Sequence, residues 1–166
     1  MNNEIDINNL ALNVILSRKS IRSYTKDKVT DKQIDILLKA GMAAPSACDM
    51  RPWSFVVCHD AKWANAPCVI VVCGRRTATP AFELDGVWTQ DCAAVTENIL
   101  LAAHSIGLGA CWRVCWPSPT VMANIKAQVN LPFGVIPFSY VTIGVPAENP
   151  PCKGKYDLEL VHYERW

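Results

Sequence analysis

Residues 17–24 bring three cationic side chains and several hydroxyl groups together within two turns of chain, directly after an apolar segment. Arg18, Lys19 and Arg22 carry the charges, and Ser20 lies among them. Guanidinium forks and hydroxyls suit a phosphate monoester, which they bind through charge-assisted hydrogen bonds. A basic helix end is also common as a solvated group that offsets the helix dipole. Taken alone, this stretch leaves both interpretations open.

The second candidate segment is a loop at residues 43–53, with the sequence Ala-Ala-Pro-Ser-Ala-Cys-Asp-Met-Arg-Pro-Trp. Small residues, prolines and side-chain donors gathered in a loop allow close contact with a planar ligand. A plain connection from a helix to a strand, with Trp53 in the core, explains the same residues. The loop alone does not decide between these two interpretations.

Residues 106–112 contain Gly107 and Gly109 as a Gly-x-Gly pair. The dinucleotide-binding fingerprint follows a strand and opens a helix, whereas this pair follows an expected helix. The sequence contains no Gly-x-Gly-x-x-Gly anywhere. We therefore expect no Rossmann-type nicotinamide site.

The eight cysteines include no Cys-x-x-Cys pair, and most of them lie among apolar neighbours. Free cysteine in such surroundings behaves as a small hydrophobe. Zinc sites usually bring their ligands in close pairs, and the three histidines are scattered. We therefore expect reduced thiols and no metal. Cys111 and Cys115 form the one tight pair, which leaves a metal or iron–sulfur protein as a further alternative.

Hydrophobic spacing and capping signals indicate the helices that position these segments. Thr30 and Gln33 form a capping box, and Ser118 followed by Pro119 supplies an N-cap and a first helical residue. We expect helices at residues 8–17, 31–44, 87–106 and 119–129. The first helix is expected to bury Leu10, Val14 and part of Ile15 and Leu16, and the tail at residues 158–166 is expected to pack on another subunit.

Valine-rich runs indicate strands at residues 54–59, 68–74 and 135–145. The second run is apolar on both faces, which is typical of a central strand. Pro137 confines the start of the third to an edge or a bulge. Because helices and strands mix without a strict βαβ alternation, the sequence favours an α+β layer fold.

Sixteen basic and fifteen acidic side chains among 166 residues leave a formal charge of +1, and 51% of positions are apolar. Such a composition is that of an ordinary globular chain, and the length suits one domain over residues 1–166. The small charge gives no electrostatic case for a nucleic-acid partner. The longest clean apolar run, 68–73, is too short to cross a bilayer, and residues 1–16 lack the basic region of a secretory signal. We therefore expect a cytoplasmic protein without a membrane partner.

In this order, the segments resemble the FMN-dependent nitroreductase family. The family pattern Arg-Arg-Ser-Ile-Arg-x-Phe is matched by residues 18–24, and Ala-Pro-Ser-x-x-Asn-x-Gln-Pro-Trp by residues 44–53. The helix pattern Asp-x-x-Ala-x-x-x-Asn-Ile-Leu-Leu-Ala-Ala is matched by residues 91–103. The resemblance covers nearly the whole chain. It implies a central mixed, mostly antiparallel sheet flanked by helices, in an interlocked homodimer.

The resemblance also implies one FMN in each of two clefts along the subunit interface. Arg18 and Ser20 would hold the phosphate together with Lys19 and Lys155, and Arg22 would lie near N1 and O2 of the flavin ring. A fixed cation there favours reduction, because reduced flavin carries negative charge at N1. The ring contacts implied are Pro45, Ser46, Ala47, Asp49 and Arg51 from the other subunit, and the backbone of Arg113, Val114 and Cys115 near N5.

The chain departs from the family pattern in the loop. Asp49 stands where the family has asparagine, and Arg51 where it has glutamine. An asparagine amide can donate to a flavin carbonyl, whereas an ionised carboxylate cannot and repels anionic flavin. We expect Arg51 to compensate Asp49, with a simple solvated pair as the alternative. The connection at residues 60–66 is also shorter than in relatives, which bears on the substrate.

The resemblance implies ping-pong chemistry, in which NAD(P)H reduces FMN and a nitroaromatic, quinone or similar electron-poor molecule is reduced in turn. We expect no catalytic side chain, because the cofactor carries the chemistry. Trp112 and Trp116 are expected either to pack in the structure or to line the acceptor pocket. The alternative function, which Asp49 keeps open, is a homodimer that stores or senses FMN with little turnover.

Overall fold

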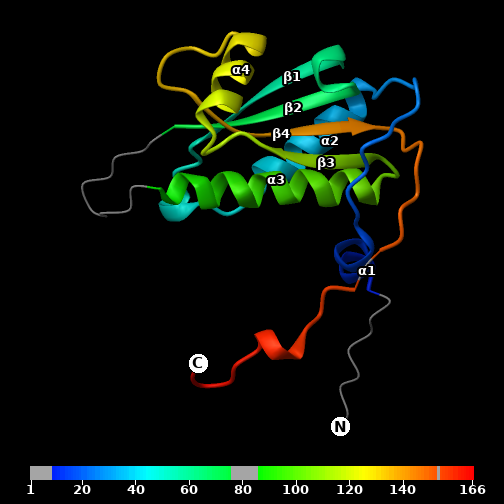
Figure 1. Cartoon of the computed structure of the whole chain (residues 1–166), viewed down its shortest axis with the longest axis vertical. Helices are drawn as coiled ribbons and strands as arrows, with labels where there is room; N and C mark the ends of the chain where they lie inside the picture. The colour runs from blue at the N-terminus through cyan, green and yellow to red at the C-terminus, as the bar shows by residue number, and fades with distance from the viewer. Residues whose placement is uncertain (1–8, 76–85, 153) are drawn as a thin grey trace.

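The computed structural model describes residues 9–75, 86–152 and 154–166. A four-stranded sheet with the order β1-β2-β4-β3 forms the centre of the fold (Figure 1). The strands are β1 (Trp53–Ala61), β2 (Ala66–Gly74), β3 (Gly109–Val114) and β4 (Ile136–Gly144), and each pairs antiparallel with its neighbour. The helices are α1 (Leu10–Ser17), α2 (Asp31–Met42), α3 (Val87–Ser105) and α4 (Pro119–Val129), with short 3-10 turns η1 (Ala47–Asp49), η2 (Lys62–Ala64) and η3 (Leu158–Leu160). The α+β prediction is confirmed.

Helices cover both faces of the sheet, with α3 and α4 on opposite sides (Figure 1). On the α2 and α3 side, Leu37 and Ile99 belong to the same buried cluster as Ile70 of β2. On the other side, Ile125 of α4 shares a second buried cluster with Val71. Successive strand residues point to opposite faces, so adjacent residues of β2 serve different clusters. This two-sided burial explains why the β2 sequence is apolar throughout.

The local helix signals correspond to real contacts. The Thr30 hydroxyl accepts from the amide of Gln33 at 3.3 Å, and the Gln33 side chain accepts from the amide of Thr30 at 2.9 Å. Ser118 caps α4, with Pro119 as its first residue. The capping-box and N-cap predictions are both confirmed.

Pro137 lies at an irregularity of an interior strand. It pairs with Cys73, whereas Ser139 pairs with Val72, so β4 carries an extra residue between them. A proline has no amide to donate to the ladder, and a bulge accommodates that lack. Of the two placements that the sequence allows, the structure adopts the bulge.

Two features differ from the expectations. Residues 109–114 form β3, a strand that the sequence analysis does not predict, because its glycine-rich start has the composition of a loop. The expected burial of Leu10 and Val14 is wrong for the single chain: α1 has no buried residue, and Leu10 is 83% exposed. The α1 helix and the C-terminal segment extend away from the main body (Figure 1).

None of the helices in the described residues combines the length and the hydropathy that a membrane-spanning helix needs.

Candidate functional site

The cation segment, residues 18–22, is held beside the first residues of β3. Ser20 forms a parallel bridge with Ala110, and the amide of Ile21 donates to the carbonyl of Ala110 at 3.0 Å. Ile21 is buried and lies so close to Gly109 that a Cβ there would be 2.7 Å from its Cγ2. Glycine at this position therefore permits the close approach that places the cations along the edge of the sheet.

Arg18 and its neighbours form a largely enclosed corner between α1 and α3. The Arg18 side chain is 17% exposed, and its Nε lies 3.3 Å from Oε1 of Glu97. Ser17 Oγ and His104 Nε2 are 2.8 Å apart and share a hydrogen bond. Burial, followed by the charges of Arg18 and Lys19, lowers the pKa of His104 below its ordinary value. At neutral pH the imidazole is therefore uncharged, and the two basic side chains supply the positive charge of this corner.

A strap of residues 147–152 runs beside the cation segment. Oε1 of Glu148 accepts from the consecutive amides of Arg22 and Ser23. Lys19 Nζ donates to Oδ1 of Asn149 at 2.5 Å. Consecutive amides that converge on one oxygen are a common anion-binding arrangement. The strap thus fixes the backbone around Arg22 by supplying an anion from the chain itself.

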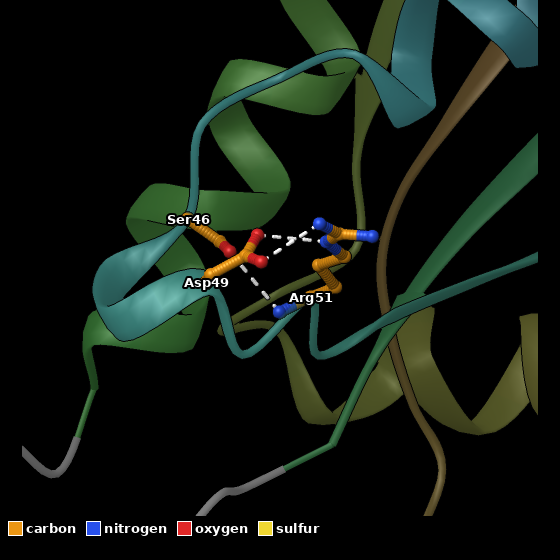
Figure 2. A network of polar contacts seen from close by, with 3 residues as sticks. All are labelled: Ser46, Asp49 and Arg51. Carbon is orange, nitrogen blue, oxygen red and sulfur yellow. Dashed lines mark hydrogen bonds and ion pairs between the residues drawn. The ribbon is translucent and has the colours of Figure 1, made fainter.

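The loop of residues 45–51 holds an unusual backbone. Cys48, Asp49 and Arg51 have φ angles of 51°, 53° and 46°. These left-handed conformations are uncommon for residues other than glycine and persist where surrounding contacts enforce them. Two contacts restrain the loop. The amide of Ala47 donates to the Asp91 carboxylate at 3.0 Å. The amide of Arg51 donates to Ser46 Oγ at 3.1 Å, as Figure 2 shows.

Asp49 and Arg51 form a bidentate ion pair, seen in Figure 2. Arg51 Nε donates to Asp49 Oδ1 and Arg51 Nη2 donates to Asp49 Oδ2, both at 2.7 Å. The hydrogen bond from Arg51 holds the pKa of Asp49 below its ordinary value. Both side chains are well exposed, so the loop presents a neutralised carboxylate to the solvent. The expected pair therefore forms, and its role toward a flavin stays a prediction.

Different faces of α3 hold the loop and the cation segment. Asp91 contacts the loop and Asn98 contacts the end of α2. On another face of α3, His104 contacts Ser17 at the end of α1, and Glu97 contacts Arg18, the next residue. At 3.6 residues per turn, Glu97 and His104 lie about 120–140° around the helix from Asp91. Within one chain, the two candidate segments therefore lie on different sides of α3.

Near Val114, at the C-terminal end of β3, the edge of the strand away from β4 pairs with no other strand among the described residues. The carbonyl of Ala110 faces the cation segment, whereas the amide of Cys115 donates to the carbonyl of Phe138 at 3.1 Å. Because backbone groups of an antiparallel strand alternate between its two edges, the amide of Val114 faces the edge away from β4. Arg113 and Val114 are exposed. Of the three residues expected near N5, Val114 is the one whose amide is directed outward.

The remaining predicted residues lie in two surroundings. Lys155 is in the exposed C-terminal segment, three residues beyond Cys152, and no hydrogen bond or ion pair joins it to the described part of the cation segment. Trp112 and Trp116 pack edge-on against Phe138 and Trp88, with ring centroids 5.9 and 5.2 Å apart. They contribute to the core, as the packing interpretation predicts.

The cysteine pair at 111 and 115 lies inside the protein. Both residues are buried, and burial raises the pKa of Cys115 to about 12. In the part of the chain that the structure describes, no group of three His, Cys, Asp or Glu side chains is placed to hold a metal ion.

The sequence analysis missed Glu97, His104 and Glu148 as partners of the cation segment. Glu97 and His104 are seven residues apart, which places them on one face of the predicted helix. The sequence shows this spacing, but it does not indicate that this helix face contacts Ser17 and Arg18.

Comparison with known proteins identifies the family. Residues 15–62 and 58–145 match the model described as the nitroreductase family. A protein of Methanothermobacter thermautotrophicus, named "Putative NADH dehydrogenase/NAD(P)H nitroreductase", is 38% identical over 169 residues, which cover 93% of this chain and 87% of the relative.

Solved structures agree with this match. A Bacteroides thetaiotaomicron protein of the same name has a TM-score of 0.87 at 37% identity, over 95% of this chain and 99% of the other. A Desulfovibrio desulfuricans protein, described as a "putative nitroreductase in complex with fmn", has a TM-score of 0.76 at 27% identity, over 94% of this chain and 97% of the other. The residues that match the family model include the cation segment, the loop and β3. The chain belongs to the nitroreductase family.

Proposed function

We propose that this protein is an FMN-dependent oxidoreductase that uses NAD(P)H to reduce a nitroaromatic, a quinone or a similar electron-poor small molecule. When bound, FMN supplies the hydride and electron transfer, and the protein supplies position and electrostatics. Family membership supports this function, as do the NAD(P)H named for the Methanothermobacter relative and the FMN in the Desulfovibrio structure.

The observation that carries the proposal is the bridge between Ser20 and Ala110. It places the cation segment on the same edge of the sheet toward which the Val114 amide is directed. Val114 lies four residues beyond Ala110 along the strand, a distance of about 13 Å. This span is on the scale of a flavin with its ribityl phosphate, so one end can bind the phosphate and the other can donate to the ring.

The residues fit the cofactor chemically. Arg18 has no hydrogen bond from its Nη atoms to the described residues, so these donors are available to phosphate oxygens together with Ser20 and Lys19. A guanidinium binds phosphate in a fork of two hydrogen bonds. Arg22 is exposed, and its backbone is fixed by Glu148. It is available to lie near N1 and O2 of the flavin and to favour the reduced form.

A second subunit completes the proposed site. The loop and the cation segment of one chain lie on different sides of α3, so we assign the loop contacts to the partner. Leu16, Leu160 and Trp166 are 65%, 76% and 102% exposed in the single chain. Apolar surface of this kind on two projecting segments supports an interlocked homodimer. In it, Pro45, Ser46, Ala47, Asp49 and Arg51 face the ring, and Lys155 joins the phosphate site.

The test is an absorption spectrum of the purified protein before and after anaerobic addition of NADH or NADPH. We expect a bound flavin spectrum, bleaching by the reduced nucleotide, and recovery of the colour when a nitroaromatic or quinone is added. A protein that takes up no FMN when it is supplied would refute the proposal. Arg18→Ala should lose FMN while remaining folded, whereas Lys126→Ala, an exposed cation in α4, should keep it.

Asp49 favours one alternative, a dimer that stores or senses FMN. Its carboxylate replaces an amide donor of the family pattern. Arg51 forms an ion pair with this carboxylate, but the pair is exposed, so solvent weakens the neutralisation. This alternative predicts the same bound flavin but negligible bleaching by NADH and NADPH. The spectrum therefore separates the two functions.

A further inference from the structure

Arg18 carries its charge where water has little access. The side chain is 17% exposed, and a cation enclosed in this way requires a counter-charge beside it. Glu97 provides that charge at 3.3 Å from Nε. Within residues 9–75, 86–152 and 154–166, no other acidic side chain forms an ion pair with the cation segment.

The other described groups near Arg18 do not balance the charge of its guanidinium, so Glu97 is the anion that does. Lys19 is hydrogen-bonded to Asn149, which is neutral. His104 has a lowered pKa because of burial and of the nearby cations, so it adds no positive charge at neutral pH. Glu148 contacts backbone amides rather than the Arg18 guanidinium. The charge that a phosphate meets at Arg18 is therefore set by Glu97.

The contact between Arg18 and Glu97 has the form of an exchangeable ion pair. It joins one nitrogen to one oxygen at 3.3 Å, whereas Arg51 holds Asp49 through two hydrogen bonds of 2.7 Å (Figure 2). The Glu97 side chain is 45% exposed, so its carboxylate can return to water. A phosphate that binds the guanidinium fork makes shorter and stronger hydrogen bonds than this contact.

We propose that Glu97 is the resident counter-anion of Arg18 and that its negative charge limits the affinity for the cofactor phosphate, which binds the same guanidinium. The inference rests on the proposed function, because it concerns the FMN phosphate. The carboxylate remains a few Å from the bound phosphate, and two like charges at that distance repel each other in a partly screened site. Removing the charge of Glu97 should tighten FMN binding by about three- to ten-fold.

The test compares FMN with riboflavin, which lacks the phosphate. Dissociation constants are measured by flavin fluorescence for the wild type, Glu97→Gln and Asp35→Asn. Glutamine keeps the size and a hydrogen-bond acceptor for Arg18, so only the charge is removed. Asp35 is a matched control, because it is a helix carboxylate paired with Lys39 on the exposed side of α2. A second measurement is the increase in melting temperature that inorganic phosphate causes in the apo-form of each protein.

We expect Glu97→Gln to bind FMN more tightly, to bind riboflavin as the wild type does, and to be stabilised more by inorganic phosphate. Asp35→Asn should match the wild type throughout. If the wild type binds FMN, an unchanged or weaker FMN affinity in Glu97→Gln overturns the inference and leaves the proposed function intact. An equal gain for riboflavin also overturns it, because the effect would then not act through the phosphate. A wild type that binds no FMN refutes the proposed function and the inference with it.

Discussion

The carboxylate of Asp91 accepts a 3.0 Å hydrogen bond from the amide of Ala47, which ties the loop of residues 45–51 to the first half of α3. Asp91 is buried, with 7% exposure, so its oxygens depend on protein donors. The contact also restrains the start of η1, where the backbone enters the left-handed region at Cys48. A buried side chain of α3 thus restrains the position of an exposed loop.

Replacing Asp91 by alanine should therefore both destabilise the protein and displace the loop. We expect a loss of about 1–3 kcal/mol in the free energy of unfolding, because the Ala47 amide loses its charged acceptor. Urea unfolding measures this, and FMN titration should show weaker binding if the partner's loop contacts the ring. Asp35→Ala, which removes an exposed helix carboxylate, should change stability by less than about 0.5 kcal/mol. Equal stability of the two variants would contradict the role given to Asp91.

The structural features that were predictable from sequence depend on neighbours within a few residues. Thr30 and Gln33 are three positions apart, and the capping box they form needs no knowledge of the rest of the fold. The ion pair of Asp49 with Arg51 is similarly local. In both cases the residue types and spacing already define the contact.

The features that escaped prediction depend on pairings between distant segments. β3 exists because residues 109–114 pair with β4 and because Ser20 bridges Ala110, and neither partner is evident from the glycines themselves. The contact of Arg18 with Glu97 joins two segments that are separated in the chain by α2, β1 and β2. The spacing of its apolar residues predicts an apolar face on α1. That spacing does not indicate whether the same chain or a second copy of the chain covers this face.

Gly109 should resist substitution because of its contact with the cation segment. A Cβ at this position would lie 2.7 Å from Cγ2 and 2.8 Å from Cβ of Ile21. Ile21 is buried and cannot move aside freely, so Gly109→Ala should cost about 1–3 kcal/mol of stability. It should also weaken FMN binding, because the strain displaces Ser20. Gly154→Ala, where nothing lies within 4 Å of the new Cβ, is the control. Wild-type unfolding and binding in Gly109→Ala would show that the approach is not tight.

His104 should make stability depend on pH. Burial and the neighbouring cations lower its pKa in the folded state from the ordinary 6.5. As the pH falls below about 6.5, the unfolded chain binds a proton that the folded chain does not, so the free energy of unfolding decreases. The decrease continues until the pH passes the lowered pKa. His104→Gln, which keeps a side chain able to bond Ser17, should lack this component.

The measurement is urea unfolding of both proteins between about pH 7.5 and pH 5, a range that spans the ordinary histidine pKa. The wild type should lose more stability than His104→Gln over this range, and their difference removes the contribution of the carboxylates. Bound FMN should reduce the difference, because a phosphate beside Arg18 and Lys19 offsets their charge. Parallel pH profiles of the two apo-proteins would contradict the lowered pKa.

The pair of Asp49 and Arg51 should tune the reduction potential of bound FMN, if the partner's loop faces the ring as proposed. Reduction adds negative charge to the flavin, and an uncompensated carboxylate nearby opposes it. Arg51→Gln should therefore lower the midpoint potential, Asp49→Asn should raise it, and the double variant should return close to the wild type. The shifts should be no more than a few tens of millivolts, because the exposed pair is screened by solvent.

Lys62→Gln, which breaks the exposed pair with Asp60, is the control for a general effect of removing a surface charge. Equal potentials in all four variants, measured by anaerobic dye-coupled titration, would place the pair away from the flavin and leave Asp49 and Arg51 as a solvated surface contact.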